Sequence, residues 1–417
     1  MTHLFVHYHL RSGGVTRVLQ QEAVEFSERG IPFVTLSAGP ASSAPGEHRE
    51  IPWLDYASNS PYSEKDLLAA VQDLPRPLIW HIHNPTLGCH PEMAAMVHRL
   101  ALAQERLLLH IHDFAEDGRP ENRQRLSQGP PWFPIGARIH YVVLTRRDRD
   151  VLCRAGLSES QVTILGNPIT PHPLPLRIRT NPRVLYPTRA ITRKNIGEIL
   201  LLAALAPAGT TFATTLGPGS SRHQEDYRHW QMIAEELALP IEWAIAETGN
   251  PPPTLEDCIA EATHLITTSK QEGFGMAFLE SIAWQKPLIG RAIPHIEEHL
   301  SEAGIAHPFL YEGIFVDGID FAKQPTAEQT RILQHARSQP ESVQVLQRNK
   351  FIDARQWLQE ALSPTHQPLP LSLLDPFHPQ RHGESITRIA QSLRDAPESV
   401  ISHLDADSIR RSFSQND

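Results

Sequence analysis

The feature that most constrains the fold is an alternation of short apolar runs with amphipathic stretches, which covers the first half of the chain. The apolar runs, read as strands, lie at residues 3–10, 31–37, 77–83, 106–112 and 137–145. Residues 15–29 read as a helix that Gly30 closes in the usual C-terminal position, and 146–156 read as another. Strands that alternate with helices predict βαβ units and a mostly parallel sheet.

The second half of the chain restarts the same pattern. Strands are expected at 183–188, 210–217, 240–245, 263–269 and 286–291, and helices at 195–206 and 224–239. A proline-rich segment, NPITPHPLPLRIRTNP, separates the halves and has the composition of a linker.

The fold class predicted from these patterns is α/β, with two doubly wound Rossmann-like domains that face a cleft. The expected boundaries are an N-terminal domain at 1–170, a linker at 171–182, a C-terminal domain at 183–364, and an irregular tail at 365–417. We expect a helix at 384–394 within that tail to cross back over the cleft.

The composition limits which kinds of partner and which cellular compartment we expect. The 417 residues carry a formal net charge of -9, which repels phosphates and argues against a nucleic-acid partner. Three scattered cysteines, an odd number, give no disulfide framework and suit a reducing cytoplasm. The longest apolar run, Ile199 to Ala206, is far shorter than the roughly 20 residues that span a bilayer. We therefore expect a cytoplasmic protein without a transmembrane segment, which is compatible with a peripheral membrane contact.

The strongest chemical signal is EGFGMAFLE, which runs from Glu272 to Glu280 between an expected strand and an expected helix. Its two glycines allow the backbone to approach a ligand, and the start of the helix directs N–H groups and a positive dipole at an anion. The two carboxylates are placed to reach different parts of one elongated ligand. A plain strand-to-helix turn that contains glycine would share this pattern.

This motif resembles the signature of the group 1 (family 4-like) retaining glycosyltransferases of GT-B fold. The resemblance implies that Glu272 sits beside the donor sugar and that Glu280 binds the ribose hydroxyls of the nucleotide. It also implies that backbone N–H groups of the loop hold the sugar and diphosphate, which makes the following residues donor-binding: Gly273, Phe274, Gly275, Met276 and Ala277.

A pair of cations, Arg189 and Lys194, follows the expected strand 183–188. Two cations at the carboxyl end of a strand suit a diphosphate leaving group. The family carries an arginine and a lysine at this spacing, and the resemblance implies that they grip the diphosphate. The family's usual glycine before the arginine is Thr188 here, and Arg193 is expected to have no direct role. A solvated basic turn is the competing interpretation.

Glycine turns supply further candidates for binding the donor. Gly13 and Gly14 follow the first expected strand, where the resemblance implies that Gly14 touches the donor diphosphate or the acceptor. The pair is not the Gly-x-Gly-x-x-Gly fingerprint, so a nicotinamide cofactor is not expected. Gly217 and Gly219 lie in a turn that resembles the family's nucleotide-side loop.

Two His-x-His pairs, His81/His83 and His110/His112, lie on expected strands. Residues two apart in a strand face the same side, so each pair presents both imidazoles together. A metal site built from the two strands is one interpretation, but no carboxylate or cysteine ligand at suitable spacing is evident. In the other interpretation, His81 and His110 are packed strand residues, and His83 and His112 lie at strand ends facing the cleft. The resemblance places His112 against the transferred sugar.

The resemblance, together with these observations, implies a retaining glycosyltransferase that moves a hexose from a nucleotide-diphosphate sugar to an unidentified acceptor, which is a glycan, a lipid or a small polyol. The catalytic residues are Glu272, Arg189, Lys194 and His112. No Asp-x-Asp motif occurs, and the two cations can replace a divalent ion, so we expect no metal and no cofactor. A nucleotide-sugar epimerase of GT-B fold and a noncatalytic protein that binds sugar nucleotides are the alternatives.

Overall fold

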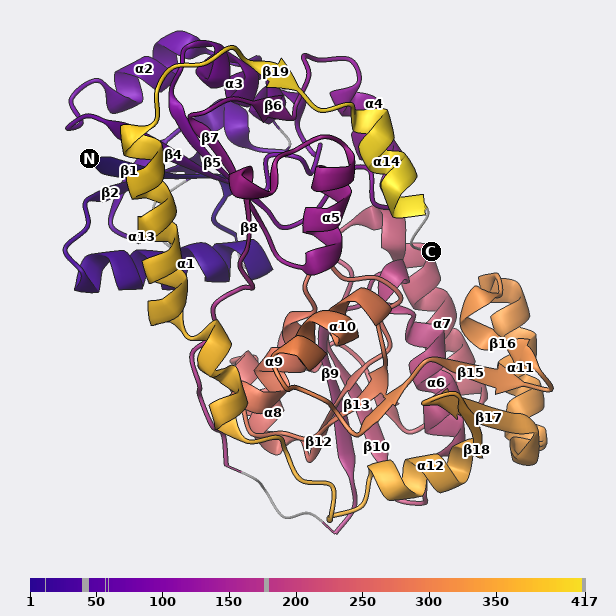
Figure 1. Ribbon diagram of the computed structural model, residues 1–417. Coiled ribbons are helices and arrows are strands. Elements are labelled where there is room, and N and C mark those ends of the chain that lie inside the picture. The colour runs from indigo at the N-terminus through magenta and orange to yellow at the C-terminus, as the bar shows by residue number, and fades with distance from the viewer. Residues whose placement is uncertain (12, 40–44, 57, 59, 176–179, 415–417) are drawn as a thin grey trace. The chain divides into compact units, whose positions relative to one another are not determined.

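The computed structural model describes residues 1–11, 13–39, 45–56, 58, 60–175 and 180–414. The chain divides into two compact units, one formed by Met1–Ile169 with Phe377–Asp417 and the other by Thr170–Pro376. Each unit contains its own parallel sheet flanked by helices (Figure 1). Part of the predicted linker, residues 176–179, lies outside the described residues.

The first unit is built on a seven-stranded sheet in the order β3-β2-β1-β4-β5-β7-β8, and each neighbouring pair is parallel. Its strands are β1 (Thr2–His9), β2 (Phe33–Ala38), β3 (Glu47–Glu50), β4 (Leu78–His83), β5 (Arg106–Ile111), β7 (Ile139–Val143) and β8 (Val162–Ile164). The order reverses between β1 and β4, so the carboxyl ends of the central strands β1, β4 and β5 lie at a topological switch point, where α/β sheets bind ligands.

Seven helices of the described residues accompany this sheet: α1 (Gly14–Glu28), α2 (Glu64–Val71), α3 (Pro91–Leu102), α4 (Pro120–Leu126), α5 (Arg146–Arg154), α13 (Pro379–Asp395) and α14 (Ala406–Ser414). A short antiparallel pair joins β6 (Pro134–Ile135) to β19 (Ser402–His403). The late helix α13 packs beside α1 (Figure 1), because Ile386 and Leu393 complete an apolar core with Phe5 and Phe26. Burial of that face draws the C-terminal segment into the first unit.

The second unit is built on a six-stranded parallel sheet in the order β11-β10-β9-β12-β13-β14. Its strands are β9 (Arg183–Arg189), β10 (Thr211–Leu216), β11 (Ile241–Glu242), β12 (His264–Thr267), β13 (Leu288–Arg291) and β14 (Phe309–Tyr311). Its helices are α6 (Ile196–Leu205), α7 (Gln224–Glu236), α8 (Leu255–Glu261), α9 (Met276–Ala283) and α10 (Pro294–Glu302). Helix α6 is apolar around most of its circumference and is buried almost throughout.

The second unit also contains a small antiparallel sheet in the order β16-β15-β17-β18, which the sequence did not predict. It consists of β15 (Gly313–Val316), β16 (Ile319–Asp320), β17 (Val343–Gln347) and β18 (Lys350–Asp353), with helices α11 (Thr326–Ser338) and α12 (Ala354–Ala361). Its inner residues Ile314, Val343 and Val345 join the same core as α6, so the small sheet extends this unit.

The predicted α/β class with two Rossmann-like domains is confirmed. The expected strand at 240–245 is cut to two residues, because Ala244 adopts a left-handed conformation (φ 49°) that ends the extended backbone. The expected helix at 384–394 begins earlier, at Pro379, where His378 caps its first turn. Among the residues that the structure describes, no helix combines the length and apolarity required to cross a membrane.

Candidate functional site

The first group of candidate residues surrounds the carboxylate of Glu272 in the loop after β12. Lys194 donates to Oε1 of Glu272, and Nη1 of Arg193 donates to Oε2 at 2.8 Å. Oγ of Ser269 donates to Oε1 at 2.5 Å, so each carboxylate oxygen has a fixed partner. The loops after β9 and β12 thus meet at the carboxyl edge of the sheet, because these two strands are neighbours.

The electrostatic setting keeps Glu272 ionised. Burial alone would raise its pKa, but the charges of Lys194 and Arg193 lower the pKa to about 2. The side chain of Glu272 is 14% exposed, so an anionic oxygen is held at a fixed point near the surface. Such a carboxylate can accept hydrogen bonds from sugar hydroxyls.

Helix α9 begins directly after this loop, and Gly275 makes that start feasible. Gly275 has a φ of 72°, and a Cβ there would lie 2.7 Å from a ring carbon of Phe278 and 2.9 Å from Cδ1 of Ile296. Only glycine fits the backbone and the space. Met276 and Ala277 form the first turn, and Glu280 lies half-buried one turn later. The start of the helix has the geometry and dipole that favour an anion.

Arg189, the last residue of β9, lies with the predicted glycine turn. Its Nη1 donates to the carbonyl oxygen of Gly217 at 3.0 Å and is 4.0 Å from Oε1 of Glu247. A Cβ on Gly219 would lie 3.2 Å from the same guanidinium nitrogen, which shows how closely the turn wraps this side chain. The Arg189 side chain is 45% exposed, so its charge stays accessible to an anionic ligand.

A buried ion pair supports the turn that carries Lys194. Arg291 donates to Glu198 at 2.5 Å and 3.0 Å, and the hydroxyl of Tyr311 donates to the same carboxylate at 2.6 Å. Asn195, which has a φ of 53°, also donates to Glu198 at 2.8 Å. This network fixes the left-handed residue directly after Lys194 and thereby the direction in which the cation leaves the strand.

In the first unit, the predicted residue Gly14 opens α1 immediately after Gly13. Gly14 is exposed, and a Cβ placed on it would meet no heavy atom within 4 Å. The packing of this unit therefore does not require glycine at this position, in contrast to Gly275.

The prediction that each His-x-His pair presents both imidazoles on one side is confirmed. The rings of His81 and His83 stack at a centroid distance of 4.3 Å, and those of His110 and His112 stack at 4.4 Å. His83 and His112 do lie at or next to strand ends, but both are buried, and Nδ1 of His83 lies 3.2 Å from Nε2 of His112. Burial lowers the pKa of His112 well below its ordinary range, so its imidazole is neutral.

No protein-family model matches the chain. A curated protein is similar to it in sequence. The chain is 24% identical over 341 residues to mannosylglucosyl-3-phosphoglycerate synthase of Petrotoga mobilis. The match covers 72% of this chain and 66% of that protein, so the chain spans just under two thirds of the length of its relative.

Solved structures match nearly the whole chain. HepE of Anabaena in complex with UDP and glucose aligns with a TM-score of 0.57 at 13% identity, over 94% of this chain and 100% of that one. Sucrose-phosphate synthase of Thermosynechococcus elongatus aligns with a TM-score of 0.59 at 14% identity, over 94% and 98%. The chain has the GT-B fold.

Within this GT-B fold, the second unit gathers most of the predicted residues into two neighbouring groups. Glu272 and Lys194 form one group with the start of α9, and Arg189 forms the other with Gly217 and Gly219.

Arg193, which was expected to have no direct role, and Ser269 both donate to Glu272. Glu198, which supports the turn that carries Lys194, was likewise not predicted from the sequence. Glu198 had a visible signal, because it is an acidic residue inside the apolar run IGEILLLAAL.

Proposed function

We propose that this chain is a retaining glycosyltransferase that moves a hexose from a nucleoside diphosphate sugar to an acceptor. The observation that carries the proposal is the fixed, ionised carboxylate of Glu272, which lies beside the cations Lys194 and Arg193 and next to the start of α9. This arrangement combines an acceptor for sugar hydroxyls with donors for a diphosphate, and a nucleotide sugar presents both groups next to each other.

The comparisons support a donor of this class. HepE was solved with UDP and glucose and with UDP-glucose, and another structure of the same fold is a galactosyltransferase of the lipopolysaccharide outer core. The relative from Petrotoga mobilis is a synthase of a glycosylated phosphoglycerate. The names of the last two proteins point to different products, a lipopolysaccharide core and a glycosylated phosphoglycerate, so the acceptor of this chain is left open in the proposal.

The proposal assigns a role to each predicted residue. In the second unit, Glu272 binds the transferred sugar and Glu280 binds the ribose. The backbone of Gly273, Phe274, Gly275, Met276 and Ala277 cradles the sugar and diphosphate, and the turn with Gly217 and Gly219 approaches the nucleotide. Arg189 and Lys194 bind the diphosphate. In the first unit, His112 contacts the sugar and Gly14 contacts the diphosphate or the acceptor.

The proposed reaction breaks the bond between the anomeric carbon and the diphosphate oxygen through an oxocarbenium-like transition state. Negative charge grows on the leaving phosphate, so Arg189 and Lys194 stabilise the transition state more than the ground state. The acceptor oxygen bonds to the anomeric carbon on the face from which the diphosphate leaves, and the leaving phosphate takes the proton of the acceptor hydroxyl, so the anomeric configuration is retained. This mechanism requires neither a protein nucleophile nor a metal in the donor site.

The proposed donor site is tested by thermal unfolding with UDP, GDP, ADP and their sugar conjugates. We expect one nucleotide to raise the Tm of the wild type, and Glu280→Ala to weaken that effect by removing the ribose contact. Glu235→Ala, an exposed substitution on α7, is the matched control and should leave the effect unchanged. If no nucleotide stabilised the wild type at millimolar concentration, the donor assignment would be wrong.

The reaction is then tested by incubating the preferred nucleotide sugar with candidate acceptors and determining the product anomer by NMR. Transfer with the donor's anomeric configuration is the expected result. An inverted product would contradict the proposed mechanism, and an altered free sugar formed without an acceptor would indicate an epimerase instead.

A further inference from the structure

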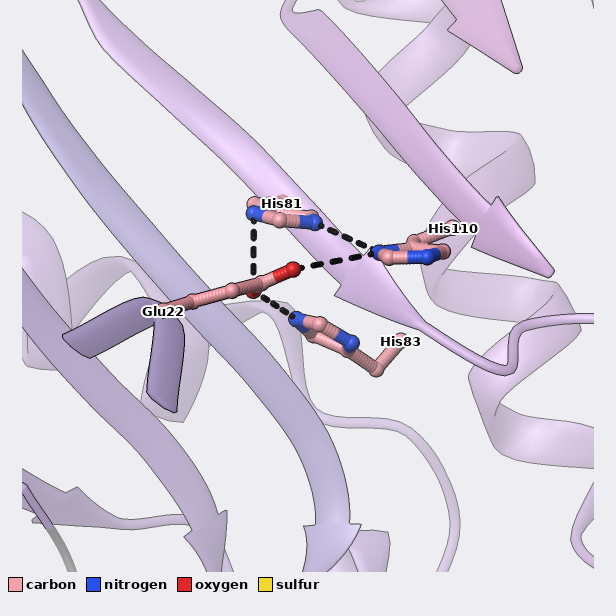
Figure 2. Close-up of side chains that lie close together, drawn as sticks. All are labelled: Glu22, His81, His83 and His110. Carbon is pink, nitrogen blue, oxygen red and sulfur yellow. Dashed lines mark hydrogen bonds and ion pairs between the residues drawn. The ribbon is translucent and has the colours of Figure 1, made fainter. Parts of the chain in front are cut away.

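Four side chains of the first unit gather around one point. Glu22 comes from α1, His81 and His83 come from β4, and His110 comes from β5 (Figure 2). One ligand atom from each of these residues lies within 4.8 Å of the others, and all four side chains are fully buried. The sequence showed the histidines but not the carboxylate. Glu22 lies 59 residues before His81 in the chain, and helix α1 brings its carboxylate to the histidines.

The separations between these atoms suit a tetrahedral metal ion. Nε2 of His83 lies 3.1 Å and Nδ1 of His81 lies 3.7 Å from Oε2 of Glu22. Nδ1 of His110 lies 3.5 Å from Oε1. Bonds of about 2.0–2.1 Å to a four-coordinate zinc ion place neighbouring ligand atoms roughly 3.3–3.4 Å apart. The distances from the histidine nitrogens to the two oxygens of Glu22 are close to this value, and the four ligand atoms all lie within 4.8 Å of one another, so small shifts of the side chains would close them around an ion.

Hydrogen bonds within the described residues leave three of these atoms unsatisfied, whereas Nδ1 of His110 lies 3.2 Å from Nε2 of His81 and Oε1 of Glu22 is paired with His382. Oε2 of Glu22, Nδ1 of His81 and Nε2 of His83 are buried without a hydrogen-bond partner there, and the two nitrogens both lie near that oxygen. A buried polar atom without a partner destabilises the fold, and a charged one does so more strongly, so three together are unusual. A cation among them would satisfy all three.

The surrounding residues have the arrangement that supports metal ligands. Nε2 of His382 lies 2.6 Å from Oε1 of Glu22 and so fixes the carboxylate from its other oxygen. Nδ1 of His83 lies 3.2 Å from Nε2 of His112, which leaves Nε2 of His83 directed at Glu22. Outer partners of this kind normally orient the histidines and carboxylates that bind a metal.

We propose that Glu22, His81, His83 and His110 bind one divalent transition metal ion of the zinc class in a structural site. Three imidazole nitrogens and one carboxylate oxygen suit Zn²⁺, whereas Mg²⁺ and Ca²⁺ prefer all-oxygen ligand sets. The four protein ligands and their complete burial describe a closed site without a position for substrate. This inference departs from the expectation of no metal and does not depend on the proposed function.

The test begins with the wild-type full chain, purified, incubated with excess ZnCl₂ and freed of loose metal by gel filtration. Elemental analysis should find about one zinc ion per chain, as for a structural site. Replacement by Co²⁺ should give the intense visible absorption of a tetrahedral cobalt centre. Retention of less than about a tenth of an ion per chain, with no cobalt band, would overturn the proposal whatever the variants do.

Variants then locate the ion. Each of three substitutions removes or neutralises one ligand: Glu22→Gln, His83→Asn and His110→Asn. Each should weaken zinc binding by at least the 10- to 100-fold that is typical when a residue hydrogen-bonded to a metal ligand is lost. His140→Asn is the matched control, because His140 lies in the same sheet and bonds Thr163 outside the cluster. Zinc binding that survives in all three variants would place the ion elsewhere and refute the assignment. If a variant does not fold, the zinc content and the cobalt spectrum of the wild type decide the question instead.

Discussion

The substitution Gly275→Ala tests whether the loop before α9 is fixed by backbone geometry. A left-handed conformation costs an alanine about 1–2 kcal/mol, and Gly275 has a φ of 72°. The new methyl group would also lie 2.7 Å and 2.9 Å from two ring carbons of Phe278 and 2.9 Å from Cδ1 of Ile296, well inside ordinary contact. Overpacking of this kind costs about 1–3 kcal/mol, so the free energy of unfolding of the second unit should fall by about 2–5 kcal/mol.

Thermal unfolding by calorimetry measures this effect. A domain of about 150–250 residues loses roughly 2–4 °C in Tm per kcal/mol, so the transition of the second unit should fall by about 4–20 °C. Gly14→Ala is the matched control, because a Cβ there meets no heavy atom within 4 Å and the residue has no positive φ. Its Tm should stay within about 2 °C of the wild type. An unchanged Tm for Gly275→Ala would refute the geometric argument.

Three further predictions concern buried charges. Arg291→Met should destabilise the second unit by about 3–5 kcal/mol in urea denaturation, because it leaves the buried Glu198 without its cation. The double variant Glu198→Leu/Arg291→Met should recover much of that loss, and equal losses in both would contradict this explanation. The pKa of Glu272 is lowered to about 2, so its ionised form contributes stability that is present above its ordinary pKa of 4.5 and is lost as the pH falls toward 2. The Tm difference between the wild type and Glu272→Gln should therefore shrink below pH 4.5, and a constant difference would count against the ion pair with Lys194. Burial raises the pKa of Glu116 to about 7, so ionisation of this group opposes folding as the pH rises from 4.5 through 7. Glu116→Gln should accordingly gain Tm relative to the wild type over that range and match it at lower pH, and a relative loss would show that the buried carboxylate is stabilising.

The sequence by itself determined the elements and their class. Apolar runs such as 77–83 and 106–112 became β4 (Leu78–His83) and β5 (Arg106–Ile111), because a buried parallel strand needs only a short continuous apolar run and turns at both ends. The motif from Glu272 to Glu280 was also legible, because glycine placement and the start of a helix are local properties.

The partners of the charged residues could be read only in part. Glu22 stands at helical spacing between Val18 and Phe26, both of which are buried, and this spacing was a signal that the acidic side chain lies on the apolar face of α1. The pattern does not tell what that face meets. Glu198 gave the same kind of signal inside an apolar helix, and its partner Arg291 lies 93 residues further along the chain.

The tertiary structure alone decided which distant groups share one buried environment. His382 reaches Glu22 across 360 residues, because burial of the apolar face of α13 places that helix beside α1. The four groups of the proposed metal site similarly meet only once β4 and β5 pair and α1 covers them. Local periodicity fixes which face of an element is apolar, but the contacts between elements depend on how those faces pack, and the chemistry of a buried polar group is set by that packing.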